Sequence, residues 1–594
     1  RHQRMGKPKY KAVIDGSIEI LPIMTIATLV SVLIFIPLIL VSGIVGVFFK
    51  QLSIVMVITY LISQILAIFF VPIMAYLLLP EESKQENDFI EKIKLKYLNF
   101  FKKAIKFDYL SIPVIIILFL LTYFLYTKIP STFLPKWDEG NLVVDFTFTP
   151  GTSLEDSYKE ALEIGKIISS IPEVENWTLR IGTSLGHISE SSNVGDFLVI
   201  LKKDRDRSIF QIQDEIREKV ETRFKNLQEF DLPQVIEDRL ADIMGEEAPI
   251  SVILYGKDPD KLITYGEKLR DKLREKSILE EVNLKTNYTA PEITIKVKPS
   301  SYEIYGLTVD DVYNQLNTIY WGQVFGSIIS GEQIINLRLI YLKNTSLYDL
   351  EKTLIYSPKS DSFVPLNQVA YLQLKNNVPE ITHYNLSPVA VITSRFKGDN
   401  MSEAIKVINA TISEMNLPSD ITPVLSGFYK QQKKSFKEMS IAITLAILII
   451  FISLSLVFAD VIISLSILFA VILPLFGIFA LLIILGKPLD ITALMGILIV
   501  LSITINNNIL IFDFYKNSTE TDEVKRVLEA VSSRFRPITM TMLSNSLAML
   551  PIALSIGSGT QIIQNLAISI LGGLSFAIVV NLLIIPLFFL FVKR

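Results

Sequence analysis

Three consecutive amides stand inside one of the most apolar stretches of this 594-residue chain. Asn506, Asn507 and Asn508 interrupt the hydrophobic run 492–513. An amide in hydrocarbon is costly unless it is hydrogen-bonded across helices or hydrated. The run therefore predicts that these side chains face the interior of a helix bundle, where they either hold helices together or line a polar path.

Other reactive chemistry is sparse. The chain has no cysteine, so it offers no thiolate to a metal or a substrate. No Gly-rich phosphate loop and no Ser/His/Asp arrangement stands out, so we expect no enzyme activity, no ATP-driven step and no cofactor. Soft cations prefer several sulfur or imidazole donors together. Because His187, His383, Met244, Met401 and Met415 are few and scattered, we expect surface histidines and no metal site.

The elements that position the amides are predicted to cross a membrane. Half of the residues are hydrophobic and the mean hydropathy is +0.44. The net charge of −3 gives no indication of nucleic-acid binding. Eight apolar runs can each span the ~30 Å of a bilayer core, namely 22–42, 52–79, 110–128, 440–458, 461–485, 492–513, 538–556 and 566–592.

Lysine and arginine predict the orientation of these helices. They are concentrated in the loops of one face, with five in 1–17, seven in 80–109 and five in 514–536. The positive-inside rule then places both termini in the cytoplasm and the polar segment 130–437 outside. Within 80–109, Ile93, Tyr97 and Phe101 recur at helical spacing among lysines, which predicts an amphipathic helix on the inner membrane surface.

An internal repeat predicts that more chain precedes the first residue. A shift of 514 residues superposes three Pro or Gly pairs, Pro37 on Pro551, Gly43 on Gly557 and Pro72 on Pro586. We interpret 22–79 and 537–592 as copies of one two-helix unit that ends a longer repeat. The first copy would lack an outer domain and four helices, roughly 400 residues, so we expect a C-terminal fragment.

The polar segment alternates strand and helix patterns. Strand patterns at 142–149, 196–202, 250–256 and 389–396 are each followed by a helical pattern. Recurring units of this kind predict small α+β sandwiches. The motif WDEG (137–140) allows two interpretations, a turn into the first strand or acidic groups that attract cationic substrates.

The chain resembles the resistance-nodulation-division (RND) efflux permeases of Gram-negative inner membranes. The resemblance rests on FLPKWDEGNLVVDFTFTPGTSLEDS (133–157), SYEIYGLTVDDVYNQL (301–316), VPLNQVA (364–370), NNNILIFDF (506–514) and RFRPITMTMLSNSLAMLPIAL (534–554). It implies a membrane α-helical bundle with a large periplasmic α+β domain, made of ferredoxin-like porter subdomains and a docking subdomain. It also implies a proton-driven homotrimer that works with a periplasmic adaptor protein and an outer-membrane channel.

The implied division of the chain follows the family order. It comprises the last two helices of the first repeat (1–79), a cytoplasmic amphipathic helix (80–109), a transmembrane helix (110–129), a first porter subdomain (130–248), a second porter subdomain in two parts (249–299 and 381–437), a docking subdomain (300–380) and a five-helix transmembrane region (438–594).

The resemblance also implies a proton-relay region of Asn506, Asn507, Asn508, Thr541 and Asn545. Many drug-exporting relatives carry a lysine at the position of Asn506, and the carboxylates it pairs with belong to the part of the family sequence that is missing here. The alternatives are packing amides and, for Thr541, a hydroxyl bonded to its own helix backbone.

The substrate is the least determined feature. Phe146, Phe148, Trp177 and Phe197 suit an apolar binding pocket, although they equally suit an ordinary core. We expect export of amphiphilic organic compounds, with the lipid bilayer and a small-molecule substrate as partners. The alternatives are a heavy-metal cation permease of the same superfamily and a truncated assembly part without transport activity.

Overall fold

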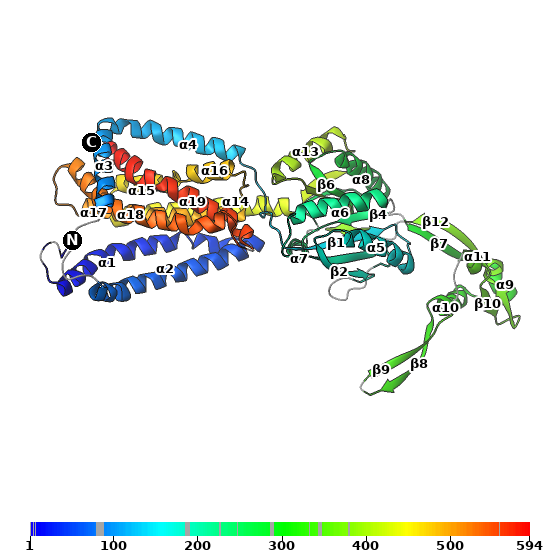
Figure 1. Cartoon of the computed structure of the whole chain (residues 1–594). Helices are drawn as coiled ribbons and strands as arrows, with labels where there is room; N and C mark the ends of the chain where they lie inside the picture. The colour runs from blue at the N-terminus through cyan, green and yellow to red at the C-terminus, as the bar shows by residue number, and fades with distance from the viewer. Residues whose placement is uncertain are drawn as a thin grey trace.

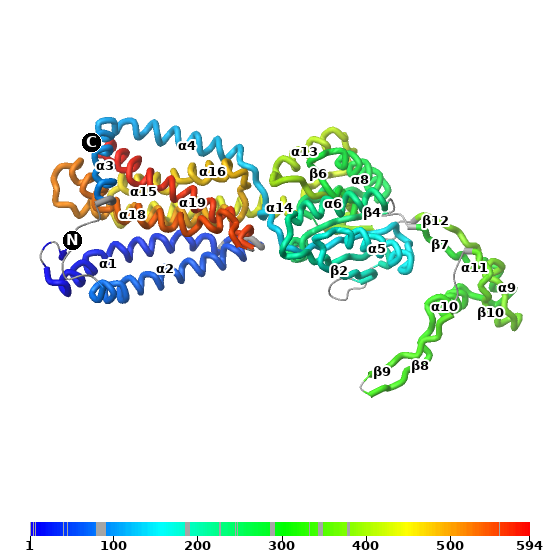
Figure 2. Tube along the Cα trace, in the orientation of Figure 1, coloured from blue at the N-terminus to red at the C-terminus, as the bar shows by residue number. Residues whose placement is uncertain are grey.

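The protein consists of a helix bundle, two α/β units and a protruding arm. The computed structural model describes residues 2–3, 5, 7–78, 88–183, 191–224, 227–245, 248–285, 290–331, 333–341, 347–377, 381–557 and 559–594. Figure 1 shows the bundle at one end, the sheets beside it and the arm beyond them. Both termini lie at the end of the bundle away from the sheets, as the chain trace in Figure 2 also shows.

The bundle is built from apolar segments at both ends of the chain. Its elements are α1 (Lys9–Leu33), η1 (Pro37–Leu40), α2 (Gly43–Leu78), α3 (Asp88–Ala104), η2 (Ile105–Leu110), α4 (Ser111–Lys128), α14 (Phe428–Phe458), α15 (Val461–Ile472), α16 (Leu475–Ile484), α17 (Ile491–Lys516), α18 (Glu523–Ala553), η3 (Thr560–Ile563), α19 (Gln564–Val579), η4 (Val580–Ile584) and α20 (Ile585–Lys593).

Seven helical segments of the described residues are long and apolar enough to cross a membrane, where the sequence predicted eight. The missing one is the run 538–556, which lies mostly in α18. This helix forms and packs along α19, but Thr541, Asn545 and neighbouring serines lower its hydropathy. Four of the five crossings predicted within 438–594 therefore meet the criterion of length and composition.

Each copy of the predicted repeat has two long helical segments joined near the paired glycine, but the short 3-10 helix precedes Gly43 in the first copy and follows Gly557 in the second. Gly43 and Gly557 both have positive φ, +72° and +109°, a conformation that side chains disfavour. The copies differ in where the first helix ends. It stops before Pro37 in the first copy, whereas Pro551 lies inside α18 in the second.

The amphipathic helix α3 packs its apolar face on the bundle. The Tyr97 ring stacks on Phe535 of α18 with centroids 4.7 Å apart, and Phe101 is fully buried. The Tyr97 hydroxyl donates to the carbonyl of Leu582 in the π-helical segment η4. A π-helical turn disturbs the normal backbone ladder, so Tyr97 supplies a partner to a carbonyl at that irregularity.

The first α/β unit has the order of a split β-α-β fold. It comprises β1 (Asn141–Phe148), α5 (Leu154–Ser169), β2 (Val174–Ile181), β3 (Val194–Leu201), α6 (Ile209–Arg223), β4 (Leu227–Asp231) and α7 (Val235–Met244). The antiparallel sheet has the strand order β2-β3-β1-β4. This is the ferredoxin-like arrangement, with the apolar faces of α5 and α6 covering the sheet.

The second α/β unit repeats this arrangement. It comprises β5 (Ile250–Tyr255), α8 (Pro259–Arg274), β6 (Leu279–Leu284), β13 (His383–Tyr384), β14 (Ser387–Phe396), α13 (Met401–Glu414) and β15 (Thr422–Ser426). Strand β14 lies between β6 and β5, and β5 also pairs with β15. Asp258 caps α8 and Pro259 opens its first turn, which stops β5 and starts the helix.

The arm is inserted between β6 and β13. Its elements are β7 (Ala290–Val297), α9 (Ser300–Tyr305), α10 (Val309–Tyr320), β8 (Gln323–Ser330), β9 (Gln333–Leu339), α11 (Leu347–Glu351), β10 (Leu354–Ser357), β11 (Ser362–Pro365), α12 (Leu366–Val369) and β12 (Ala370–Asn377). It has its own small core, and the hairpin β8–β9 extends furthest from the two units (Figure 1).

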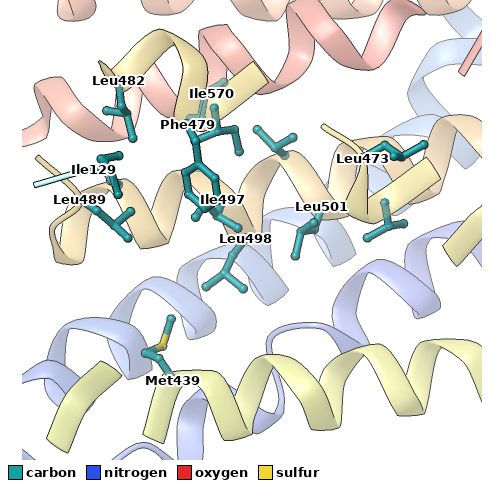
Figure 3. Close-up of a cluster of buried hydrophobic side chains, with 14 of the residues drawn as sticks. Ile129, Met439, Leu473, Phe479, Leu482, Leu489, Ile497, Leu498, Leu501 and Ile570 are labelled. Atoms are coloured by element: carbon teal, nitrogen blue, oxygen red, sulfur yellow. The ribbon is translucent and has the colours of Figure 1, made fainter. Parts of the chain in front are cut away.

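The bundle core is continuous and apolar. Figure 3 shows Met439 of α14, Phe479 and Leu482 of α16, and Ile497 and Leu498 of α17 among its buried side chains. Directly beside it, the backbone N–H of Leu489 donates to the carbonyl of Pro130 at 2.8 Å. This hydrogen bond fixes the linker that follows α4 to the start of α17. The same linker leads from the bundle into the first α/β unit.

Candidate functional site

The asparagine run faces the bundle interior, as the sequence predicted. Asn507 and Asn508 are buried and Asn506 is partly exposed. The Nδ2 of Asn508 donates to the carbonyl of Thr504 at 2.8 Å and to Oδ1 of Asn581 in η4 at 2.9 Å. Asn581 was not singled out from the sequence, although it is the one amide in the apolar run 566–592. The amide pair joins α17 to η4.

Several polar atoms around this pair have no hydrogen-bond partner among the described residues. They are Nδ2 of Asn507, Oδ1 of Asn508, Nδ2 of Asn581 and Oγ1 of Thr504. Leaving a buried donor or acceptor unsatisfied costs about 1–3 kcal/mol. Packing between α17 and η4 therefore explains one hydrogen bond of the run, but not why so many polar atoms gather here.

Thr541 and Asn545 of α18 do not join this hydrogen-bonded group. The Thr541 side chain is exposed, and its hydroxyl donates to the carbonyl of Pro537 at 2.8 Å. Asn545 is partly exposed. Of the two interpretations of Thr541, a part of the proton relay or a hydroxyl bonded to its own helix backbone, the observed hydrogen bond matches the second.

The WDEG motif forms a turn that anchors helices. The N–H of Gly140, with φ +74°, donates to Oδ1 of Asp138 at 3.0 Å. Asp138 also accepts from the N–H of Ile209 at the start of α6 and forms an ion pair with Arg205. Glu139 accepts from the N–H of Ile236 in α7 at 2.8 Å. The turn interpretation is confirmed, because both carboxylates are engaged in holding the fold.

The aromatic residues proposed for substrate binding lie in the first α/β unit. Phe146, Phe148 and Phe197 are buried in its closed core. Trp177 packs edge-on against Phe197 at 5.3 Å, and its ring nitrogen donates to Ser169 at 2.8 Å. None of these four side chains lines either of the two cavities described next.

The larger cavity, of about 320 Å³, lies where the linker after α4 meets both α/β units. Its apolar and aromatic lining comes from Phe133, Leu134, Pro135, Trp137, Phe210, Leu232, Pro249, Phe396, Met401 and Phe428. Cavities of this size and character hold small organic ligands. Met401 is the only one of the sequence-selected methionines in this lining. His383 is exposed on β13 and His187 lies outside the described residues.

A buried ionic network forms one wall of this cavity. Glu281 has φ +48° and a completely buried side chain. It is contacted by Arg217 of the first unit and by Nε of Arg395 of the second, the latter at 2.8 Å. Arg395 also pairs with Glu237 at 2.7 Å. The network therefore joins the two units, and its side chains come from segments too distant in sequence to be grouped in advance.

A second cavity of about 160 Å³ lies beside the network and is acidic. Here Lys285 of the second unit pairs with Glu229 at 2.6 Å and with Asp231 at 2.8 Å, both on β4. Burial alone would lower the pKa of Lys285, but these two carboxylates raise it well above its usual value. Burial, together with the neighbouring Asp238, raises the pKa of Asp145 to about 8.

The carboxylates of these walls do not form a metal site of the usual kind. Within the described part of the chain, no group of three or more His, Cys, Asp or Glu side chains is arranged to hold a metal ion. The carboxylates of the network are instead bound to arginine and lysine.

The architecture is therefore two ferredoxin-like units beside a bundle of long apolar helices, with an arm inserted in the second unit. A crystal structure of a heavy metal efflux pump (crystal form II) has the same fold, with a TM-score of 0.84, 19% identity, and coverage of 99% of this chain and 61% of that one. The family model described as the AcrB/AcrD/AcrF family matches residues 1–593. The chain belongs to this family of RND permeases.

Relatives of this chain carry names from two substrate classes. Cation efflux system protein CzcA of Alcaligenes sp. (strain CT14) is 23% identical over 586 residues, which cover 95% of this chain and 55% of the relative. Multidrug resistance protein MdtC of Klebsiella pneumoniae (strain 342) is 25% identical over 614 residues, which cover 100% of this chain and 58% of the relative. The chain thus spans a little over half the length of these relatives, all of them named as resistance or efflux proteins.

Proposed function

We propose that this chain forms part of a proton-driven efflux permease that exports amphiphilic organic compounds. The observation that carries the proposal is the cavity of about 320 Å³ between the two α/β units. It combines aromatic side chains with a few charged groups, which suits a molecule with an apolar body and a polar end. Its wall includes Phe133 and Phe428, at the points where the chain enters and leaves the bundle.

The asparagine region would supply the polar path for protons. Asparagine does not titrate, so Asn506, Asn507 and Asn508 would position water or carboxylates of another segment rather than carry the proton themselves. The unsatisfied atoms around Asn508 and Asn581 support this role over pure packing. Thr541 and Asn545 border the same helices and remain candidates for the relay.

The proposed setting is the Gram-negative inner membrane. The α/β units would be the porter subdomains and the arm the docking subdomain, all in the periplasm. The arm's exposed apolar hairpin, with Phe325, Ile329 and Ile334 on its surface, supports assembly into a homotrimer that joins an adaptor protein and an outer-membrane channel. Exposed apolar surface of this extent marks protein contacts.

The second candidate is efflux of heavy-metal cations. It is favoured by relatives such as CzcA, named for cation efflux, and by the acidic side chains around the smaller cavity. The lack of a ligand cluster among the described residues weighs against it. A third candidate is an assembly part without transport activity.

Expression of the complete gene in a host without its own pumps tests these candidates. We expect raised tolerance to dyes, bile salts and detergents. Raised tolerance to zinc, cobalt, copper or silver alone would establish the metal permease instead. No change for either class, with the protein present in the membrane, would favour the inactive assembly part.

A further inference from the structure

A lysine in the lining of the larger cavity lies near aromatic rings of both α/β units. The Nζ of Lys136, on the linker after α4, lies 5.7 Å from the ring centroid of Phe210 and 5.4 Å from that of Phe396. Phe210 belongs to α6 of the first unit and Phe396 to β14 of the second. Ammonium groups within about 6 Å of an aromatic face are held by the ring quadrupole. The two units thus form an aromatic clamp around one ammonium group.

Lys136 is held there by little else. Its side chain is exposed, and it has no hydrogen bond or ion pair to the residues that the structure describes. Among the described residues, the lining carries four carboxylates and, apart from Lys136, three cations, namely Arg217, Arg395 and Lys397. When Lys136 swings out, the cavity wall has an excess of one negative charge, which favours replacement by another cation.

The apolar body of such a ligand has space beside the clamp. The rings of Phe133 and Phe428, which is the first residue of α14, lie 5.9 Å apart between centroids, and the buried Met401 lies in the same lining. Flexible methionine and aromatic surfaces adapt to different apolar groups.

We propose that this cavity binds amphiphiles with a cationic head, and that Lys136 occupies the head position as a tethered competitor in the free protein. The inference rests on the proposed export of amphiphiles and names the charge of the substrate. It assigns the clamp to Phe210 and Phe396, and makes Lys136 a residue that weakens binding. A lysine that recognises an anionic head would have the opposite effect, because it would strengthen binding.

The test is direct binding to the whole chain in lipid nanodiscs, measured by calorimetry. The probes are benzyltrimethylammonium and phenylmethanesulfonate, which share a benzyl body and differ in charge. We expect Lys136→Ala to tighten binding of the ammonium probe at least threefold and Phe210→Leu to weaken it about fivefold. Lys136→Arg keeps a cation in the clamp, and Lys203→Ala removes an exposed lysine outside the cavity lining, so both should leave the affinity within twofold of the parent.

Each result decides the proposal. Weaker or unchanged binding of the ammonium probe by Lys136→Ala overturns it. Equal tightening for both probes also overturns it, because that result reports only added space. Since binding is measured without transport, a chain that binds the ammonium probe as expected but confers no tolerance in cells would refute the proposed efflux and leave the clamp intact.

Discussion

Asp145 provides a test of the interface between the two α/β units. This carboxyl on β1 faces Asp231 and Asp196 across the strand pairs. Burial raises its pKa from 3.8 to about 8, Asp238 adds to the increase, and Lys285 offsets only part of it. At neutral pH the folded protein therefore keeps Asp145 protonated, whereas the unfolded chain ionises it.

The sign of the pH dependence follows from this difference in bound protons. Because the folded state binds the extra proton, its stability is greatest below about pH 4 with respect to this group and declines until about pH 8. At 1.36 kcal/mol for each pH unit, the loss between pH 5 and pH 8 is about 4 kcal/mol at most. Asp145→Asn removes the titration, so the variant should gain on the parent by up to this amount as pH rises.

Urea unfolding of the whole chain in a neutral detergent, followed by tryptophan fluorescence, measures this effect. Trp177 packs against the core of the first α/β unit, Trp137 lies in the linker before it, and the exposed Trp321 on the arm adds a signal common to the parent and the variants. Asp204→Asn, an exposed carboxyl beyond β3, is the matched control and should keep the parent's pH profile. Parallel profiles for the parent and Asp145→Asn would refute the assigned protonation state.

Three further outcomes follow from the structure. Asn507→Leu should abolish export while oligomer assembly measured by crosslinking is unchanged. Normal export by this variant would mean that the amides serve only to pack the helices together. Arg395→Leu should lower the free energy of unfolding by about 3–5 kcal/mol, because the fully buried Glu281 then keeps Arg217 and the N–H of Leu232 but loses one of its two cations, and the partly buried Glu237 loses its ion pair; a loss below 1 kcal/mol in urea titrations would contradict this. Reporter fusions after residues 85 and 300 should give cytoplasmic and periplasmic signals, respectively, and a cytoplasmic signal at 300 would reverse the topology.

Local patterns in the sequence predicted the elements well. The alternation in 142–149 became β1, and the Asp258–Pro259 pair starts α8. The burial of Asn507 and Asn508 also followed from the cost of amides in an apolar run. These features depend on neighbours within a few residues or on burial alone, which the sequence records directly.

Features that depend on distant segments were not predictable in this way. The partner of Asn508 is Asn581, 73 positions away, and the arginines on Glu281 come from two different units. Phe146 and Phe197 fit a pocket and a core equally well by residue type, and only the sheet order of the unit places them in the core. The cavity forms where the linker after α4 meets both α/β units, so no single sequence motif predicts it.

The most direct test of the proposed function is dye accumulation in pump-deficient cells that express the complete gene. We predict that ethidium accumulation falls and that a protonophore restores it to the level of cells without the gene. Unchanged ethidium accumulation, together with raised tolerance to zinc, cobalt or copper, would contradict the account.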